Sequence, residues 1–567
     1  MILAVWVALA ALYGCGYGYG AATASDTNCM DETRSMRWQS QVGRTVSTSS
    51  GEVRGHCAMN RRSVSEYLGI PYASPPVGKL RWAAPQPFRG STVINGSFFG
   101  HSCAANAGVS YQAVLANAAK LNLTRTATQV LDTMIGQSHE IFSEDCLTLN
   151  IWTKPQAGER QKAVMLWIYG GSFMTGSSSN AAYNGQHLAD EEDIVVVSIN
   201  YRVNIFGFPG APNTRSNLGL LDQRLAVEWT RDNIHAFGGD PQRITIVGES
   251  AGAGSVDFYS FAYTHDPIVA GFIAQSGTAS NALSPDASAS IWYEAAGLLN
   301  CGDATSHPDV VLSCMRGRDQ ESILEAIAGL PDFGPIVDNE VVFTDADTVA
   351  RAATGQFIRK PYLLGVNNNE AGLFHITYQA GGQTFPESWW KLLNEYAFNC
   401  GAAQRSKAAA AVVPTWRYRY FGDFPNLALS TAPLSGAWHG SEIPTIFGTD
   451  LEVQNLTART ASQGLINRYM QGAWAAFVRN PMEGLRDHPL SYGWPQYEPN
   501  SATLVRLAFA NLTGTNLGLP SDHDFLCPWI VPLGQALTQS TSSQSAVDVL
   551  AGLTKVVADQ VLAAFAT

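Results

Sequence analysis

Ser250 stands in the segment Gly248-Glu-Ser-Ala-Gly252, between a run that predicts a strand (244–247) and small residues with a helical pattern. This strand–turn–helix context is that of a nucleophile elbow, in which the serine hydroxyl projects above a sheet. The flanking glycines suit such a turn, because a Cβ at either position would collide with neighbouring backbone. The alternative is a chance G-x-S-x-G in a chain rich in glycine and serine, which the flanking elements disfavour.

A serine hydroxyl is a poor nucleophile unless a general base lies within hydrogen-bond reach and a third group orients that base. In proteins with such an elbow, the acid and then the histidine follow the serine along the chain. Glu370 comes just after a predicted strand at 362–366, at the strand end where α/β sheets place functional groups. The alternative is a solvated loop carboxylate, which position alone favours.

Three histidines downstream of Ser250 are candidates for the base. His439 lies in a predicted loop between small residues, ahead of an apolar run with helical character, and is the preferred candidate. A lone histidine is more often structural than catalytic. His375 and His523 are the rivals, and spacing along the chain does not exclude them.

Acyl transfer also requires hydrogen-bond donors aimed at the developing oxyanion. The predicted strand 164–169 ends in Gly170-Gly171-Ser172-Phe173, where backbone N–H groups can face a ligand. With the N–H of Ala251, those of Gly171 and Ser172 form a candidate oxyanion hole. A glycine-rich turn without a catalytic role is the alternative.

The composition is that of a folded, acidic protein. Of 567 residues, 46% are hydrophobic and 14% are charged, and the net charge is −12 without a basic run. These values argue against nucleic acid and anionic membrane surfaces as partners. After the N-terminus no run of 18 apolar residues occurs, so no membrane span is expected.

The N-terminus predicts export. Residues 1–24 resemble a signal peptide, with an apolar run and Ala22-Thr-Ala24 as the cleavage site; a buried helix is the alternative. Nine cysteines become eight if Cys15 leaves with this peptide, and an even number in an exported chain suggests disulfides. Four sequons predict glycosylation, at Asn95, Asn122, Asn455 and Asn511. We therefore expect a secreted protein.

Strands alternate with helices over most of the chain, which predicts an α/β fold with a mainly parallel sheet and helices on both faces. Residues 42–81 predict a small antiparallel start, with a proline-punctuated loop from residue 69. No repeat or long linker divides the chain, so residues 25–567 are expected to form one domain. The C-terminal stretch 546–566 is amphipathic and predicts a packed helix. Further predicted elements are strands at 147–152, 163–169, 194–201, 271–275 and 417–421 and helices at 218–233 and 460–478.

Several motifs in family order make the chain resemble the type-B carboxylesterase/lipase family, which includes cholinesterases and fungal lipases. The likeness runs from about Gly69 almost to the C-terminus and implies the α/β-hydrolase fold. The motifs are Glu144-Asp-Cys-Leu-Thr-Leu-Asn-Ile-Trp152, Trp167-Ile-Tyr-Gly-Gly-Ser-Phe173, Asn200-Tyr-Arg202, Phe237-Gly-Gly-Asp-Pro241 and Gly248–Gly252.

The resemblance implies Ser250, Glu370 and His439 as a catalytic triad that hydrolyses carboxylic esters through an acyl-enzyme, without metal or cofactor. The chain departs from the family pattern at Ser172, Asn369 and Ala371, and in the short spacing between Glu370 and His439. A catalytically silent adhesion protein is the competing class, but all three triad positions are filled. The resemblance also implies the disulfides Cys103–Cys146, Cys301–Cys314 and Cys400–Cys527, with Cys29 and Cys57 as a possible fourth pair.

The stretch between Cys103 and Cys146 bears on the substrate. It carries an apolar stripe at helical spacing that predicts either a lid like that of the family's lipases or ordinary packing. It contains no tryptophan, whereas cholinesterases use an indole there to bind a quaternary ammonium. We therefore expect uncharged, fairly apolar esters as substrates. The natural ester, interfacial activation and oligomeric state are left open.

Overall fold

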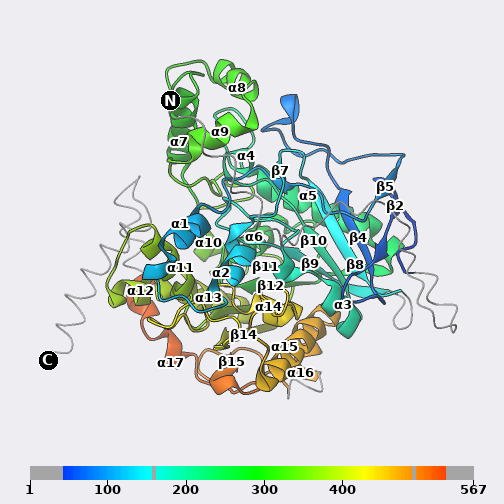
Figure 1. Ribbon diagram of the computed structural model, residues 1–567, viewed down its shortest axis with the longest axis vertical. Coiled ribbons are helices and arrows are strands. Elements are labelled where there is room, and N and C mark those ends of the chain that lie inside the picture. The colour runs from blue at the N-terminus through cyan, green and yellow to red at the C-terminus, as the bar shows by residue number, and fades with distance from the viewer. Residues whose placement is uncertain (1–41, 156–160, 488–492, 532–567) are drawn as a thin grey trace, which may run out of the picture.

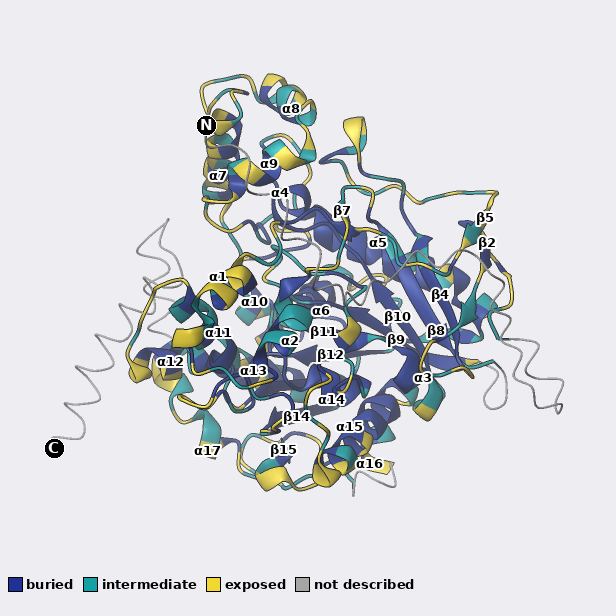
Figure 2. Ribbon diagram, in the orientation of Figure 1, coloured by how far each residue is buried: buried dark blue, intermediate teal, exposed yellow. Residues whose placement is uncertain are grey.

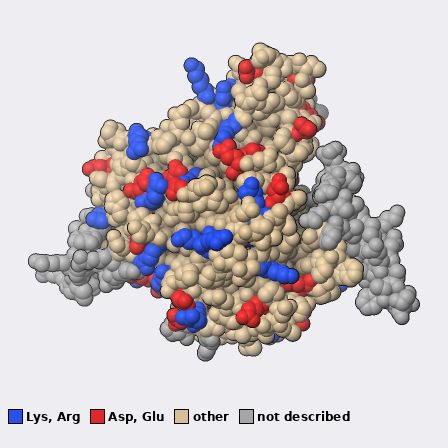
Figure 3. Space-filling view, turned by 180° about the vertical axis from the view of Figure 1, so that it is seen from behind, with Lys and Arg blue, Asp and Glu red and all other residues tan. Residues whose placement is uncertain are grey.

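The computed structural model describes residues 42–155, 161–487 and 493–531. The predicted signal peptide, Cys29 and the predicted C-terminal helix lie outside these ranges. In the described part, a large central sheet is surrounded by helices, and smaller groups of elements extend from it (Figure 1). On the opposite face of the molecule, acidic and basic side chains are scattered among uncharged ones (Figure 3). No helix in this part is long and apolar enough to cross a membrane.

Ten strands of the described chain form the central sheet, in the order β15-β14-β13-β12-β11-β9-β10-β8-β4-β3. The run from β15 to β10 is parallel, and the remaining strands are antiparallel to their neighbours. The mainly parallel sheet predicted from the sequence is thus confirmed. The strands are β3 (His56–Cys57), β4 (Ser65–Pro71), β8 (Thr148–Thr153), β9 (Lys162–Ile168), β10 (Val195–Ile199), β11 (Gly239–Glu249), β12 (Gly271–Gln275), β13 (Tyr362–Asn367), β14 (Thr415–Tyr420) and β15 (Val505–Leu507).

The central strands are buried along their whole length, as continuous apolar runs predict for a sheet covered on both faces. Figure 2 shows this buried centre in dark blue beneath more exposed helices. Helix α5 (Leu218–Asn233) and helix α15 (Ala461–Arg479) lie on opposite sides of the sheet (Figure 1). Helix α6 (Ala251–Ala262) follows β11 directly and packs against it.

The N-terminal part differs from the expectation in one place. The predicted loop from residue 69 is wrong for its first three residues, because Gly69 to Pro71 complete strand β4. The pairing of β4 with β8 is irregular between Tyr67 and Ile70, where Gly69 has φ +64°. Such a bulge accommodates a glycine inside a strand, so the Gly-Ile-Pro sequence looked like a turn. A small separate sheet is formed by β1 (Val46–Thr48), β2 (Gly51–Arg54) and β5 (Val93–Asn95).

The chain between Cys103 and Cys146 is an excursion closed by the disulfide between these residues. Its apolar stripe is mostly buried against the body of the protein, with Val114, Val130 and Leu131 fully covered. Ordinary packing therefore accounts for most of the stripe. The excursion comprises β6 (Ser102–Cys103), α1 (Val109–Asn117), η3 (Ala118–Lys120), α2 (Ala127–Leu131), the π-helix η4 (Asp132–Gly136) and β7 (Phe142–Ser143).

The helices α7 (Pro285–Leu298), α8 (Pro308–Arg316) and α9 (Gln320–Ile327) form an outlying group at the top of Figure 1, where the disulfide Cys301–Cys314 joins two of its segments. The remaining elements surround the sheet, and the disulfide Cys400–Cys527 ties the last described segment to them. These elements are η2 (Gly78–Leu80), η5 (Ala181–Tyr183), α3 (Gln186–Glu192), α4 (Asn204–Gly207), η6 (Ile234–Phe237), α7 (Pro285–Leu298), α8 (Pro308–Arg316), α9 (Gln320–Ile327), α10 (Asp345–Ala353), α11 (Ala371–Ala380), α12 (Glu387–Leu393), the π-helix η7 (Asn394–Asn399), α13 (Cys400–Ala410), α14 (Ile443–Phe447), α16 (Gly484–Asp487), η8 (Phe509–Asn511) and α17 (Ser521–Asp524).

Candidate active site

Ser250 sits at the sharp turn between β11 and α6. Its backbone has φ 55° and ψ −122°, a strained conformation for a residue with a side chain. Its N–H donates to Gln275 O (2.8 Å) on the neighbouring strand β12, and this bond holds the turn in place. A Cβ at Gly248 would lie 2.4 Å from the backbone of Gly252, and one at Gly252 would lie 2.0 Å from Ile168 O. The glycines are therefore required by the tightness of the turn, as the motif predicted.

The candidate oxyanion loop follows strand β9 and lies against the elbow. A Cβ at Gly170 would lie 2.7 Å from Ser250 Cβ, so the two segments are in contact. Gly171, Ser172 and Phe173 all have positive φ angles, which turns successive peptide groups of this loop. The N–H groups of Gly171 and Ser172 donate to no acceptor among the described residues. The N–H of Ala251 opens helix α6 and has no intrahelical acceptor, so three donors are available beside Ser250.

Glu370 and His439 form a buried pair. Nδ1 of His439 lies 2.7 Å from Oε2 of Glu370, and the side chain of Glu370 is fully buried at the end of β13. The other carboxylate oxygen of Glu370 accepts hydrogen bonds from Ser276 Oγ (2.7 Å) and from the N–H of Asn367 (2.6 Å). Three contacts thus fix the carboxylate, and the carboxylate fixes one nitrogen of the imidazole.

The rival histidines lie elsewhere. His375 stacks on Trp390, with 4.7 Å between ring centroids, and His523 packs beside Phe421. Neither histidine forms a hydrogen bond or an ion pair with Glu370. The structure therefore brings together the preferred histidine and the predicted acid.

Glu249, the residue before Ser250, is a part of the site that the sequence reasoning missed. Its Oε1 lies 3.3 Å from Nε2 of His439, the ring nitrogen not held by Glu370. This oxygen is buried and has no hydrogen-bond partner in the described part of the chain. The hydroxyl of Ser250 likewise forms no hydrogen bond with a described residue, and Ser250 is partly exposed. Glu249 belongs to the elbow motif, but its position in the sequence does not indicate that its side chain turns towards the histidine.

A third carboxylate, Glu442, follows His439 by three residues and is fully buried. It accepts hydrogen bonds from Asn367 Nδ2 (2.5 Å) and Gln275 Nε2 (3.0 Å). Burial raises the pKa of Glu442 to about 7. Asn367 also donates to the carbonyl of Trp438, so it joins the strand that carries Glu370 to the loop that carries His439.

The protonation of the site follows from this crowding of carboxylates. Burial raises the pKa of Glu249 to about 8, against the opposing positive charge of His439. Burial lowers the pKa of His439, but Glu249 and Glu370 outweigh that effect and raise the pKa to about 9. While Glu249 holds its proton it exerts no charge on the imidazole, and the pKa of His439 is then lower. A neutral Glu249 therefore brings the imidazole towards the range of a general base.

Two phenylalanine rings flank the imidazole. The centroid of Phe398, on η7, lies 4.7 Å from that of His439, and Phe374, on α11, lies at 5.2 Å. The two phenylalanine rings also stack on each other, at 5.8 Å. They restrict the orientation of the imidazole and give this side of the site an apolar wall.

The disulfide-closed excursion reaches the site from the other side. Oε1 of Gln137 accepts hydrogen bonds from the N–H of Gly176 (3.2 Å) and from Thr175 Oγ1, both at the end of the oxyanion loop. The methyl carbon of Met134 lies 3.2 Å from the position of a Cβ at Gly440, next to His439. The excursion therefore supports the loop that carries the candidate oxyanion donors.

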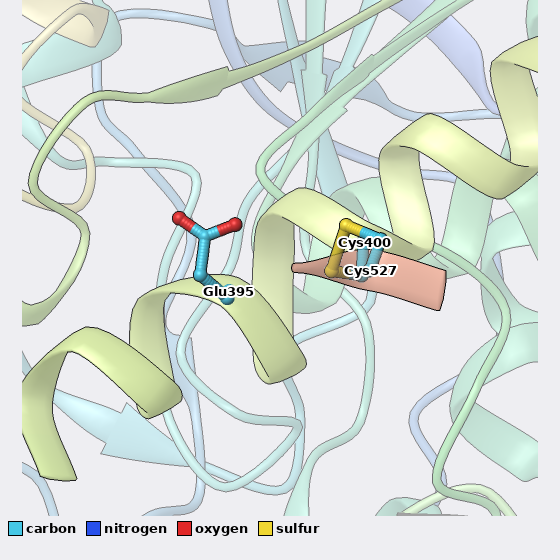
Figure 4. Close-up of side chains that lie close together, drawn as sticks. All are labelled: Glu395, Cys400 and Cys527. Carbon is cyan, nitrogen blue, oxygen red and sulfur yellow. A yellow bond between two sulfur atoms is a disulfide. The ribbon is translucent and has the colours of Figure 1, made fainter. Parts of the chain in front are cut away.

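Among the described residues, Glu395, Cys400 and Cys527 form a group of metal-ligating residue types (Figure 4). The two sulfur atoms are bonded to each other in a disulfide. A metal would require thiolates, which this bond removes. Oε2 of Glu395 accepts a hydrogen bond from Asn399 Nδ2 (2.7 Å), which gives the carboxylate a structural role.

This fold, with a serine at the elbow and a buried histidine–carboxylate pair next to it, is that of a serine hydrolase of the α/β-hydrolase class. A sequence model of the carboxylesterase family matches residues 42–388, more than half of the chain. The chain belongs to the carboxylesterase family and is a carboxylic ester hydrolase.

Relatives with curated names include both esterases and lipases. The chain is 34% identical to a chlorogenic acid esterase of Aspergillus niger, over 82% of this chain and 90% of that protein. It is 30% identical to Secreted lipase 5 of Gibberella zeae, over 85% and 93%. It is 29% identical to a cholinesterase of Mus musculus, over 76% and 78%.

Proposed function

We propose that this chain hydrolyses carboxylic esters through an acyl-enzyme formed on Ser250. His439 takes the proton of the hydroxyl as the serine attacks the ester carbonyl, and returns it to the leaving alcohol. Glu370 holds Nδ1 of the imidazole, and the N–H groups of Gly171, Ser172 and Ala251 stabilise the oxyanion. Water then hydrolyses the acyl-serine with His439 again as the base. The observation that carries the proposal is the 2.7 Å contact between His439 and Glu370 beside the strained elbow.

The proposed substrates are uncharged esters with an apolar acyl group. The rings of Phe374 and Phe398 give the imidazole an apolar surrounding. The disulfide loop 103–146 contains no tryptophan to bind a quaternary ammonium. Two relatives are named as a chlorogenic acid esterase and a secreted lipase. These names suggest two substrate classes for the test to distinguish, esters of an aromatic acid and lipid esters.

The proposed location is outside the cell. Three disulfides within the described chain fit an oxidising compartment. The sequon asparagines Asn95, Asn122, Asn455 and Asn511 are all exposed, so each is accessible for glycosylation. One of the relatives is named as secreted. Intact-mass measurement of the exported protein before and after deglycosylation tests this part.

One panel of esters tests the substrate proposal. It compares p-nitrophenyl esters from acetyl to palmitoyl, each below and above its solubility limit, with chlorogenate and butyrylthiocholine. We expect the uncharged esters to give higher kcat/KM than the thiocholine ester. A jump in rate at the solubility limit indicates a lipase. Preference for chlorogenate, whose alcohol part carries an ionised carboxyl at neutral pH, indicates an aromatic-acyl esterase and contradicts the expectation of uncharged substrates. A thiocholine ester as the best substrate contradicts the proposal, and no turnover of any ester supports a silent adhesion protein instead.

A further inference from the structure

The turn that carries Glu370 begins at the end of β13 and contains three consecutive asparagines. The N–H of Asn367 donates to Oε1 of Glu370 (2.6 Å), so the turn folds back on the acid. The N–H of Asn368 donates to Tyr420 O (2.8 Å), at the end of the neighbouring strand β14. The position of the acid therefore depends on how firmly β14 holds this turn.

Arg419, on β14, binds the same turn with its side chain. Its Nε donates to Asn368 Oδ1 (3.0 Å), and a longer bond joins its Nη2 to Asn368 O (3.5 Å). Arg419 is only 5% exposed and lies opposite Val366 in the parallel pairing of β13 with β14. A planar guanidinium that binds the side chain and the carbonyl of one residue restricts that residue more than a flexible ammonium does. The buried side chain thus anchors the turn of the acid.

The charge of Arg419 is not neutralised by a carboxylate in hydrogen-bond contact. Among the described residues, the carboxylate within 4 Å of its guanidinium is Glu395, whose Oε1 lies 3.9 Å from Nη2, and Nη1 has no hydrogen-bond partner. Arg417 precedes it by two residues, which places both side chains on the same face of the sheet. The guanidinium of Arg417 donates to both oxygens of Asp524. The charge of Arg417 is therefore paired directly, whereas that of Arg419 remains to act on other carboxylates.

Glu370 is one of the carboxylates on which this charge acts. Burial lowers the pKa of the Arg419 guanidinium, and four charged residues act on it as well: Glu395, Arg417, Glu370 and Asp524. An arginine remains protonated in a protein even when it is buried. His523 has a pKa lowered to about 4, mainly by burial and then by Arg419, so it adds no charge near neutral pH. The attraction is mutual, and the guanidinium therefore stabilises the negative charge of Glu370, which holds Nδ1 of His439.

We propose that Arg419 is a positioning residue for the acid of the triad. Its guanidinium holds the turn that carries the carboxylate and stabilises the negative charge there. The ion pair with Glu395 also joins this turn to η7, the helix whose Phe398 packs on His439. The inference rests on the proposed function, in which Glu370 orients the imidazole.

Arg419→Gln removes the charge and is assayed on the full-length protein with a soluble p-nitrophenyl ester. We expect kcat to fall by about tenfold with little change in KM, because a displaced acid no longer orients the base. The acidic limb of the kcat/KM profile should move to higher pH by about half a unit, since the loss of a nearby positive charge raises the pKa of His439. The carboxyl groups that face the imidazole stay in place in this variant: Glu249, Glu370 and Glu442. The shift therefore reports the charge of Arg419.

Two further arginine variants separate charge from structure. Arg419→Lys keeps the positive charge, so its acidic limb should coincide with that of the wild type and its kcat should lie above that of Arg419→Gln. Arg506→Gln is the matched control, because Arg506 stands opposite Arg419 on β15 and bonds to Asn516 O (2.7 Å), away from the acid. This control should leave kcat and the pH profile unchanged. Equal losses of kcat in Arg419→Gln and Arg419→Lys, with the wild-type pH profile in both, would show a merely structural role and overturn the proposal.

Asn368→Ala tests the anchor with the charge left in place, and Asn368 is exposed, so this variant is expected to fold. Its kcat should fall by about threefold while the acidic limb stays at the wild-type pH. Unchanged kcat in Asn368→Ala overturns the anchoring role, whether or not the Arg419 variants give a cooperative melting transition. Ser250→Ala is assayed in parallel. If it is inactive while Arg419→Gln behaves as the wild type, this inference alone fails, whereas an active Ser250→Ala rejects the proposed function and the inference with it.

Discussion

Nε2 of His439 lies 3.3 Å from Oε1 of Glu249, while Nδ1 of the same ring lies 2.7 Å from Glu370. The imidazole thus lies between two carboxyl groups. Three contacts hold the carboxylate of Glu370, whereas Oε1 of Glu249, which faces the ring, has no hydrogen-bond partner among the described residues. Glu370 orients the ring, whereas Glu249 acts on its charge. The nitrogen that must exchange a proton with Ser250 is therefore influenced by the residue next to Ser250 in the chain.

Glu249→Gln should move the acidic limb of the kcat/KM profile to lower pH. Ionised Glu249 raises the pKa of His439, whereas protonated Glu249 does not. Glutamine removes the ionised state, so the pH at which the imidazole loses its proton falls in proportion to the share of molecules in which Glu249 is ionised. The pH–rate profile of a soluble p-nitrophenyl ester measures this shift. Glu228→Gln, on the surface of α5, is the control and should leave the profile unchanged. A shift to higher pH in Glu249→Gln would show that the carboxyl group does not act through its charge.

Buried Glu249 should make the protein less stable as pH rises. Its folded pKa of about 8 lies above the usual 4.5, so the stability associated with its proton is fully present below pH 4.5 and is lost as pH rises towards 8. The effect is expected to be a few kcal/mol. We expect the melting temperature of wild-type protein to fall between pH 5 and pH 8, and that of Glu249→Gln to fall less. Parallel curves for the two proteins would argue against the raised pKa.

Ser250→Ala should abolish ester hydrolysis without unfolding the protein. The expected loss is on the order of 10⁴–10⁶ in kcat, because triad members act as a unit. Removal of the hydroxyl leaves the N–H of residue 250, and hence its bond to Gln275, in place. The melting temperature and circular dichroism serve as the folding control. Residual turnover at the wild-type rate in a clean preparation would reject Ser250 as the nucleophile.

His439→Ala should reduce kcat about as much as Ser250→Ala does. His523→Ala is the matched control, because His523 packs beside Phe421 and has a pKa lowered to about 4, mainly by burial. We expect this control to retain most of the activity. If His523→Ala is inactive while His439→Ala is active, the base has been wrongly assigned.

The elements that carry the site could be predicted because a short segment of sequence determines each of them. The strand, the glycines and the small residues around Ser250 define the elbow, and Glu370 follows a strand whose apolar run is continuous. The carboxyl of Glu249 and the amide of Gln137 could not be assigned in this way, because their partners lie 190 and 39 residues away along the chain. The strand that ends at Pro71 was missed for the opposite reason: a bulge gave its sequence the local character of a turn.

Gln137→Ala should lower kcat by about tenfold and change KM little, since the loss of its hydrogen bonds removes support from the oxyanion loop. Oε1 of Gln137 accepts from Gly176 N–H, and its Nε2 donates to Glu140 Oε2 (2.7 Å), so the amide joins the disulfide excursion to that loop. The donors for the oxyanion act only in the transition state, and loosening them therefore affects kcat more than substrate binding. Gln129→Ala is the matched control: this amide lies in the same excursion but bonds to Asn455 at the surface (3.2 Å), and its loss should leave kcat unchanged. A raised KM with unchanged kcat in Gln137→Ala would instead place the excursion in substrate binding.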